Sequence, residues 1–496
     1  MSDILIIGGG VSGLSAGIYA QLNGHHAIVC ERHFLPGGNL TGWNREGYHI
    51  DNCIHWLTGT NPKTDLYKMW VELGALGDVN VILGESLYTC EKDGKSLSLY
   101  RDLNRLREEM LKISPEDKKE INSLIRTVEA LEGFFGIKGE EHDKGFSLSD
   151  ALVCIPSLVK YYRLSTKDLS KRFKHPLLKS FIISFFGEDF GSLALLFVMA
   201  HFCADNGGIP EGGSLLMAKR MANRLTSLGG ELLLNKEVVS VDHEDGVARS
   251  VSFSDGTSRE LDYVVVTTDP EIAFERLIKI PMPTQLKKKY ENRMLKRFSS
   301  YQCAFACDFE NPPFVGDLIF EVPERLRDKV PLKQVIVREF SHDKSFYPEG
   351  KCVLQTMTFC SEEIAQSFIE LKAKNKEAYL RKKRLLAKML EEILVARFPE
   401  MKGKLKCLDL WTPASYKRFV ASKIGSWMSF ILPAKMIPLR DCNRVRGIKN
   451  LILATQWQQI PGGLPTAAEC GRAAVKTILR LENGVGRVKA PVLLTE

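Results

Sequence analysis

A glycine-rich turn between an apolar strand and a small-residue helix constrains this chain more than any other feature. Residues 4–7 read Ile-Leu-Ile-Ile and lead directly into Gly8, Gly10 and Gly13. A second apolar strand ends at Glu31, an acid placed to accept hydrogen bonds from ribose hydroxyls. Glycines at this spacing allow a tight turn, a close approach of backbone to a pyrophosphate, and packing of the helix on the sheet. The pattern predicts a Rossmann-type α/β domain that binds a dinucleotide.

Two further glycine motifs favour a flavin dinucleotide over a nicotinamide one. Residues 36–38 read Pro-Gly-Gly and follow Glu31 closely, so the chain can pass over the pyrophosphate side of a cofactor. Near the other end, a buried-strand pattern at 450–454 precedes Pro-Gly-Gly-Leu-Pro at 461–465 and a helical run at 466–481. The start of such a helix can face the pyrimidine edge of a flavin and stabilise the negative charge of the reduced ring. These motifs predict FAD.

With these motifs, the chain resembles the FAD-dependent carotenoid desaturase superfamily, which includes phytoene desaturase, carotenoid isomerase and retinol saturase. The resemblance covers the whole chain and includes the segments 47–56 and 212–215. It implies a glutathione-reductase-like FAD-binding domain with an inserted α+β substrate domain. It also implies an oxidoreductase that acts on carbon–carbon bonds of an apolar polyene or isoprenoid, as a desaturase, a saturase or an isomerase.

The fingerprint and the resemblance together predict the residues that hold the cofactor. The family often carries Arg where this chain has Asn39, and the sequence leaves open whether Arg32 replaces that cation. The resemblance places the backbone of Val238 beside the adenine. The predicted FAD-binding residues are Gly8, Gly10, Ser12, Gly13, Glu31, Arg32, Gly37, Gly38, Asn39, Val238, Pro461, Gly462, Gly463 and Leu464.

The chain is long enough for more than one domain. We expect the FAD-binding domain to be discontinuous, with residues 1–80, 205–280 and 442–485, and the substrate domain to hold residues 81–204 and 281–441. Asp-Gly pairs at 93–94 and 255–256 indicate hairpins, the second between strands at 251–253 and 261–266. A second G-x-G-x-x-G is absent from the sequence, so a nicotinamide domain is not expected and the electron donor or acceptor stays unknown.

Composition and charge narrow the setting of the protein. The 12 cysteines show neither C-x-x-C pairs nor zinc-like spacing, which predicts a reducing cytoplasm and no metal site. The first strand begins by Ile4 and leaves no room for a signal peptide, and the longest apolar run, 193–200, is too short to span a bilayer. The net charge of +8 comes without a nucleic-acid-binding motif, so nucleic acid is not expected as a partner.

Two basic clusters are interleaved with aromatic residues, at 160–174 and at 287–297. Lysines and arginines of this kind most often form solvated helix faces. Basic and aromatic side chains on one surface also suit an anionic lipid surface. Peripheral membrane contact is therefore a second hypothesis for these clusters, based on Tyr161, Tyr162, Phe173, Phe181, Tyr290 and Phe298.

A flavin enzyme of this kind needs a group that gives or takes a proton. His55 is the preferred candidate because it lies in the segment after the pyrophosphate loop, although it can equally be a structural hydrogen bonder. Trp457 precedes the C-terminal glycine pair and either lies near the flavin or packs in the core. His201 fits a core histidine better, and Asp205 and Glu211 fit helix caps better.

The segment 177–204, rich in Phe, Leu and Ile, is interpreted as an apolar channel for the substrate, although an ordinary helical core gives the same composition. Burial of each CH₂ group contributes roughly 0.8 kcal/mol, which suits a polyene or a prenyl lipid. Two other functions stay open. A flavin amine oxidase shares the fold, but its aromatic cage and lysine cannot be placed here. A non-catalytic flavin- and lipid-binding protein is the second.

Overall fold

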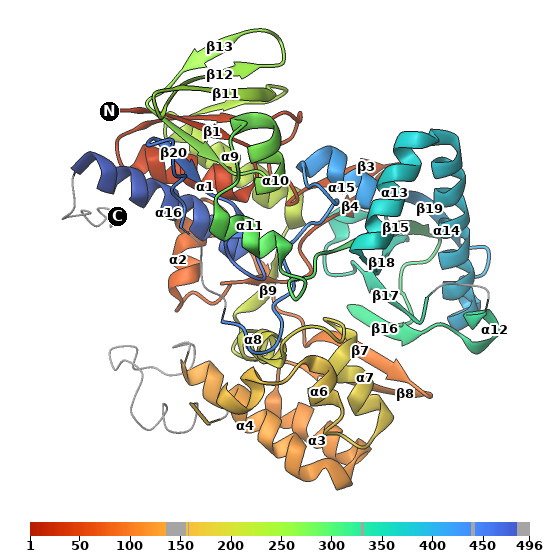
Figure 1. Cartoon of the computed structure of the whole chain (residues 1–496). Helices are drawn as coiled ribbons and strands as arrows, with labels where there is room; N and C mark the ends of the chain where they lie inside the picture. Colours follow the sequence, from red (N-terminus) through yellow and green to blue (C-terminus); the bar gives the residue numbers. More distant parts are fainter. Residues whose placement is uncertain (135–154, 157, 329–331, 438–441, 484–496) are drawn as a thin grey trace.

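A computed structural model describes residues 1–134, 155–156, 158–328, 332–437 and 442–483 (Figure 1). A five-stranded parallel sheet in the order β10-β2-β1-β14-β20 forms the centre of the first domain. Its strands are short runs of Val, Ile and Leu, because both faces of a parallel sheet are covered. Their bounds are β1 (Asp3–Ile7), β2 (His26–Cys30), β10 (Glu231–Leu233), β14 (Tyr263–Val266) and β20 (Leu451–Leu453).

The two faces of this sheet are covered by different layers. Ile4, Ile6 and Val265 belong to a cluster with apolar residues of three helices: α1 (Val11–Leu22), α9 (Gly213–Ser227) and α16 (Leu464–Asn483). The alternate residues Leu5 and Val264 belong to a cluster with an antiparallel sheet and short helical turns. That layer contains β11 (Val238–Glu244), β12 (Val247–Phe253), β13 (Ser258–Glu260), α10 (Pro270–Ile272) and the π-helical turn η2 (Ala273–Ile278). The expected Rossmann-type fold is confirmed.

The second domain is built on a seven-stranded mixed sheet in the order β19-β15-β18-β17-β16-β7-β8. Only the β16–β7 pair is parallel. This pair joins a strand from segment 81–204 to one from segment 281–441. The bounds are β7 (Ser86–Lys92), β8 (Lys95–Tyr100), β15 (Phe298–Cys307), β16 (Asp317–Glu321), β17 (Gln334–Glu339), β18 (Cys352–Ser361) and β19 (Leu405–Trp411).

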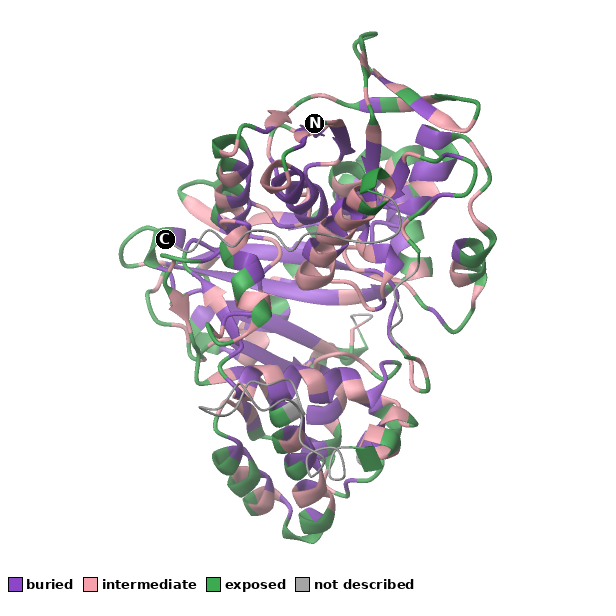
Figure 2. Ribbon diagram, turned by 90° about the vertical axis from the view of Figure 1, so that its left-hand side faces the viewer, coloured by how far each residue is buried: buried purple, intermediate pink, exposed green. Residues whose placement is uncertain are grey.

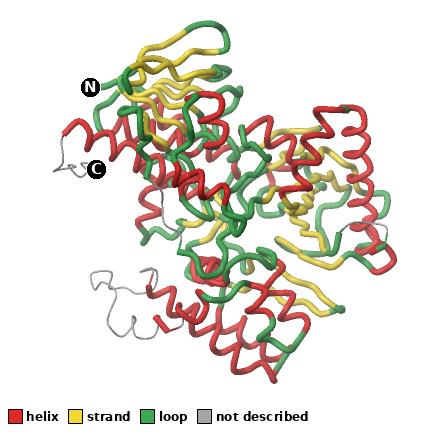
Figure 3. The backbone as a smooth tube through the Cα atoms, viewed as in Figure 1, coloured by secondary structure: helices red, strands yellow, loops and turns green. Residues whose placement is uncertain are grey.

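Two groups of helices pack on this second sheet (Figure 3). One group covers the β15–β18 part of the sheet and contains α13 (Glu362–Lys374) and α14 (Lys376–Arg397). The other group packs near β7 and β8 and contains α3 (Leu103–Ile113), α4 (Lys118–Phe134), α6 (Thr166–Ser170), α7 (Pro176–Ser184) and α8 (Ser192–Cys203). In Figure 2 the strands that cross the middle of the molecule are mostly buried, and exposed residues gather on the outer helices.

Short elements connect the two domains. Two small sheets contain β3 (Gly42–Arg45) with β4 (Tyr48–Asp51), and β5 (Leu57–Thr58) and β6 (Val81–Ile82) with β9 (Gly207–Pro210). The remaining helices and helical turns are α2 (Asp65–Glu72), η1 (Pro115–Asp117), α11 (Thr284–Glu291), α12 (Glu324–Arg327), η3 (Lys344–Phe346), η4 (Pro399–Met401), α15 (Pro413–Val420) and η5 (Gln456–Gln458). Over the described ranges, none of the helices is both long enough and apolar enough to cross a bilayer.

The hairpin prediction at 93–94 is confirmed, since β7 and β8 pair across it. The prediction at 255–256 is wrong in its second strand. β12 pairs with the short β13, and residues 263–266 leave the hairpin to form β14 between β1 and β20. The apolar run was long enough for either partner, and burial on both faces of the parallel sheet decided the pairing.

Candidate functional site

A cavity of about 1370 Å³ lies between the parallel sheet of the first domain and the mixed sheet of the second. It begins at the carboxyl ends of the parallel strands, where Gly8, Glu31, Thr267 and Thr455 line it. This edge is where open α/β sheets bind their ligands. The cavity continues to the face of the mixed sheet, to the segment after α7 and to α8.

The three fingerprint glycines serve different purposes. Gly8 has φ +108°, a conformation that favours glycine, and a Cβ on Gly13 would lie 1.9 Å from the Gly8 carbonyl oxygen. Gly13 is therefore required by packing within the protein. A Cβ on Gly10 would meet only ordinary contacts, at 3.8 Å from the Gly37 carbonyl oxygen and 3.9 Å from the Gly38 Cα. The space over Gly10 belongs to the cavity, as the approach of a pyrophosphate requires.

The start of α1 offers unused hydrogen-bond donors to that space. Gly10 caps the helix without a side-chain hydrogen bond, and the first turn contains no acidic residue. Such a helix start favours an anion. Ser12 lines the cavity, but its hydroxyl donates to the carbonyl of Ala467 at 2.6 Å and so ties α1 to α16. Only the backbone of Ser12 remains for a phosphate.

Glu31 lies at the end of β2, where it is 7% exposed and lines the cavity. Its carboxylate accepts hydrogen bonds from the backbone N–H groups of Gly9 at 2.7 Å and His33 at 2.8 Å. These bonds fix the carboxylate beside the phosphate loop and leave it further acceptor capacity for a ribose. Val238, at the start of β11, lines the same end of the cavity.

The second glycine pair crosses directly over the first loop. The backbone N–H of Gly37 donates to the carbonyl of Gly9 at 2.8 Å, and Gly37 and Gly38 have φ of +112° and +62°. Arg32 lines the cavity, but its guanidinium lies 3.9 Å from Glu237 and donates to the carbonyl of Arg418. The guanidinium is therefore engaged by protein groups.

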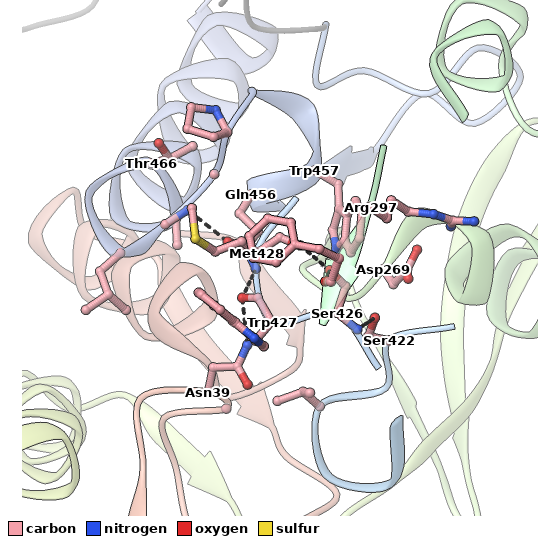
Figure 4. A pocket seen from close by; sticks show the side chains of 18 of the residues that line it. Asn39, Asp269, Arg297, Ser422, Ser426, Trp427, Met428, Gln456, Trp457 and Thr466 are labelled. Carbon is pink, nitrogen blue, oxygen red and sulfur yellow. Dashed lines mark hydrogen bonds between the residues drawn. The ribbon is translucent and has the colours of Figure 1, made fainter. Parts of the chain in front are cut away.

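Asn39, the departure from the family pattern, has a half-satisfied amide. Its Nδ2 donates to the Trp427 carbonyl at 2.9 Å, whereas its Oδ1 is buried without a hydrogen-bond partner in the described chain (Figure 4). Thr268 Oγ1, also on the cavity wall, is buried and likewise has no hydrogen-bond partner within the described chain. A bound cofactor with polar edges would satisfy both atoms, so these residues fit a dinucleotide.

The C-terminal motif closes the cofactor end of the cavity. Gly462 and Gly463 have φ of +84° and +100°, and α16 begins at Leu464. The Gly463 N–H donates to Gln456 Oε1 at 2.9 Å, and a Cβ on Gly463 would meet nothing within 4 Å. Pro461, Gly462, Gly463 and Leu464 all line the cavity, and their position beside a flavin stays a prediction.

His55 lies on the cavity wall and contacts the second domain. Its Nδ1 is 3.3 Å from Oδ2 of Asp317, and Asp317 forms a buried ion pair with Arg338. Burial lowers the pKa of His55, as does the charge of Arg338, while the hydrogen bond to Asp317 opposes the shift. Burial alone would raise the pKa of Asp317, but Arg338 and His55 lower it to about 2. Sequence reasoning missed Asp317 and Arg338, because no motif near them in the chain indicates that they lie beside His55.

Trp457 touches the cavity but is otherwise a core residue, with 3% of its surface exposed. Its ring stacks on Tyr290 with centroids 5.9 Å apart and meets Phe430 edge-on at 5.4 Å. Figure 4 draws Trp457 among the residues that line the pocket. The core interpretation of Trp457 therefore accounts for its contacts, and its role toward the cofactor stays a prediction.

The other three candidates differ in whether they reach the cavity. His201 lines the cavity, where burial lowers its pKa to about 4, and its Nδ1 is 3.0 Å from Asn206 Nδ2. Asp205 and Glu211 are not among the residues that line the cavity. Asp205 pairs with Arg101 at 3.2 Å on the surface. These contacts are structural.

A buried carboxyl that the sequence did not reveal also lines the cavity. Burial raises the pKa of Asp269 to about 6, against the backbone N–H groups of Lys423 and Glu271, which donate to it at 3.0 Å each. The Tyr290 hydroxyl donates to the same carboxyl at 3.2 Å. The charge of the Asp269 carboxyl therefore changes with pH close to neutrality.

The far end of the cavity is apolar. It is lined by side chains from the segment between α7 and α8, from α8, from the mixed sheet and from the loop after α15: Phe185, Phe186, Phe190, Phe197, Val198, Ile319, Ile336, Met357, Phe359 and Trp427. Of the segment 177–204, residues between Phe185 and His201 line the cavity, and their use as a substrate channel stays a prediction. Leu177, Phe181 and Ile182 are instead buried in the helical core.

Comparisons with known proteins agree with this arrangement. The sequence profile of the flavin containing amine oxidoreductases matches residues 11–371. Prolycopene isomerase 1 of an Oncidium hybrid cultivar is 23% identical over 453 residues, which is 86% of this chain and 75% of that protein. A 4,4'-diapophytoene desaturase of Methylomonas is 21% identical, over 96% of this chain and 94% of that protein. A solved structure of an oxidoreductase from Methanosarcina mazei shares the fold with a TM-score of 0.60, at 17% identity over 96% of this chain and 100% of that one.

Proposed function

Because the chain belongs to the family of flavin-containing amine oxidoreductases, we propose that it transfers hydride between FAD and a carbon–carbon bond of an apolar polyene or isoprenoid. It is an FAD-dependent oxidoreductase of the carotenoid desaturase and isomerase superfamily. The observation that carries the proposal is that one cavity is continuous from the predicted dinucleotide end to an end lined by aromatic and aliphatic side chains. The relatives named for desaturation and isomerisation of carotenoid compounds support the same substrate class.

Amine oxidation is the alternative that the family name raises. A cationic amine is held by a free carboxylate or an open aromatic cage. Asp317 lies on the wall of the apolar end, but Arg338 already neutralises it. The aromatic rings there pack against one another, such as Phe359 on Trp427 at 6.2 Å. These contacts favour an uncharged substrate.

The residues of the proposed site divide into two groups. The phosphate loop, Glu31, Asn39 and the start of α16 would hold the cofactor. Bound flavin accepts or delivers hydride at its N5 atom. His55 would then hold or release the proton that accompanies the hydride, and the apolar wall would orient the substrate and exclude water.

An anaerobic experiment tests the substrate class. The bound flavin is reduced, a panel of carotenoids, retinoids and prenyl lipids is added, and the flavin spectrum is followed together with the products. Reoxidation with loss of a substrate double bond indicates a saturase, and isomerised product with flavin still reduced indicates an isomerase. Oxidised enzyme with saturated substrates tests desaturation. In a separate aerobic assay, turnover of amines with peroxide release, without conversion of any polyene, would contradict the proposal.

Narrowing the apolar end is expected to block the substrate and spare the cofactor. Ala194 lies on α8, lines the cavity and is 8% exposed, so Ala194→Phe would place a ring in the channel. We expect kcat/KM for the polyene to fall by about 10-fold or more, which corresponds to about 1.4 kcal/mol. Leu193→Phe, on the same helix outside the cavity lining, is the matched control. Equal losses in both variants, or loss of flavin from Ala194→Phe, would refute the placement of the channel.

A cytoplasmic location and contact with anionic lipid stay predictions. The first basic cluster does not form the surface that the sequence indicated, because Tyr161, Phe173 and Phe181 are buried. Its basic residues form ion pairs, such as Lys160 with Glu120 at 3.3 Å. Cosedimentation of the holoenzyme with anionic and with neutral vesicles measures whether other surfaces bind a membrane.

A further inference from the structure

A buried ion pair lies at the apolar end of the cavity. On the strands β16 and β17, Ile319 and Ile336 are paired opposite each other and line the cavity. Two residues further along the same face, Asp317 and Arg338 are opposite each other in the same register. Their side chains are 5% and 8% exposed. A buried ion pair contributes little net stability compared with apolar residues of similar size, so its position calls for another explanation.

Every hydrogen bond that the Arg338 guanidinium donates within the described chain goes to Asp317 or to the backbone of residues 54–55. Its guanidinium donates to both carboxylate oxygens of Asp317, with Nη2 2.8 Å from Oδ2. The remaining donors reach the backbone carbonyl of Ile54 at 2.9 Å and that of His55 at 3.1 Å. The pair therefore fixes the backbone that carries His55.

Asp317 also determines the proton position on the imidazole. The carboxylate is ionised and can only accept hydrogen bonds, so Nδ1 of His55, 3.3 Å away, must carry the proton. Nε2 then carries a lone pair, and in the described part of the chain it makes no hydrogen bond. Burial and the charge of Arg338 lower the pKa of His55, whereas Asp317 and Asp51 raise it. The net shift is downward, so the ring is neutral at neutral pH.

We propose that Asp317 and Arg338 are positioning residues that hold His55 as the Nδ1–H tautomer, so that Nε2 is the proton acceptor for the substrate. The inference rests on the proposed function, because the cavity must hold a substrate carbon that exchanges a proton. In the direction of dehydrogenation, a C–H bond breaks and its proton forms a bond to Nε2. The electron pair of that bond becomes the new C=C bond as hydride leaves the neighbouring carbon for oxidised flavin. Saturation is the reverse, with His55 protonated.

The tautomer can be measured without catalysis. Holoenzyme labelled with ¹⁵N-histidine, compared with His55→Gln to assign the signal, is expected to show a protonated Nδ1 and an unprotonated Nε2. In Asp317→Asn, the side-chain amide can donate to Nδ1 and move the proton to Nε2. The neutral pair Asp317→Asn/Arg338→Gln covers the case in which the single variant does not fold. A His55 signal with the proton on Nε2 in the wild type would overturn the proposal.

Kinetic measurements distinguish a positioning role of Asp317 from a purely structural role. We expect Asp317→Asn to lower kcat by about 100-fold or more, the usual size of a lost acid–base contribution, with flavin content and KM nearly unchanged. In the wild type, kcat/KM for dehydrogenation should rise with pH through the His55 pKa, and for saturation it should fall. Loss of this pH dependence in His55→Gln is expected. A fully active Asp317→Asn with unchanged tautomer would refute the role of Asp317.

The two proposals fail in different ways. If the wild type has the expected tautomer but converts no polyene or isoprenoid, the positioning holds and the proposed substrate class is wrong. If polyenes are converted while Asp317→Asn keeps both its rate and its pH profile, the substrate class holds and the positioning is wrong.

Discussion

Gly10→Val is expected to give a folded protein that retains no flavin. Gly10 has φ −73° and ψ −179°, a conformation open to any L residue, and a Cβ there meets protein atoms only at ordinary distances. The valine side chain would instead occupy the space that a pyrophosphate needs. We expect an affinity loss of about 100-fold or more, equivalent to about 3 kcal/mol. Flavin absorbance of the purified protein and titration of the apoprotein with FAD measure it.

Two glycine variants act as controls for Gly10→Val. Gly133 lies exposed on α4 with nothing near its Cβ position, so Gly133→Val should keep the flavin. Gly13→Ala should fail for a different reason, because its Cβ would lie 1.9 Å from the Gly8 carbonyl oxygen and would disturb the turn itself. Full flavin occupancy in Gly10→Val would mean that the cofactor does not lie over this loop.

Arg338→Met is expected to lower the free energy of unfolding by about 3–5 kcal/mol, because it leaves the carboxylate of Asp317 buried without its cation. It also removes the donors to the carbonyls of Ile54 and His55. The double variant Asp317→Leu/Arg338→Met removes the uncompensated charge and should recover much of the loss. Chemical denaturation of the three holoenzymes compares them. A single variant as stable as the wild type would show that the pair is not buried in solution.

The pH dependence of stability should follow from the same carboxylate. The pKa of Asp317 falls from 3.8 to about 2 in the folded protein, so its ionised form stabilises the fold. That contribution, roughly 2.5 kcal/mol, is present above the unfolded pKa and is lost as the pH falls through about 2. On acidification from pH 5 toward pH 2, the unfolding free energy of the wild type should therefore decrease relative to that of the double variant.

Much of the fold could be predicted because its signals are local. The strand, the G-x-G-x-x-G turn, the helix and the acid at the end of the next strand all lie within residues 4–31, and each has a backbone reason for its residue type. The error at 261–266 arose where local pattern does not choose a partner. An apolar strand pairs equally well in a hairpin or in a parallel sheet until the other strands are in place.

The site divides in the same way. Gly8, Gly10, Glu31 and the Pro-Gly-Gly motifs could be recognised from sequence, since a dinucleotide is held largely by backbone at fixed positions of one motif. Ser12 and Arg32 lie where the sequence placed them, but their side chains bond to protein groups instead. Whether a polar side chain is bonded within the protein depends on neighbours that are far away in the chain.

By itself, the sequence determined the class of fold and the cofactor and predicted the loop that binds it, because these depend on contiguous residues with fixed geometric requirements. Only the tertiary structure decided what surrounds His55. Asp317 is 262 positions from His55, and it reaches the imidazole because β16 lies on the face of the mixed sheet that closes the cavity. A hydrogen bond or ion pair depends on distances of a few ångströms, and the packing of the two domains sets those distances.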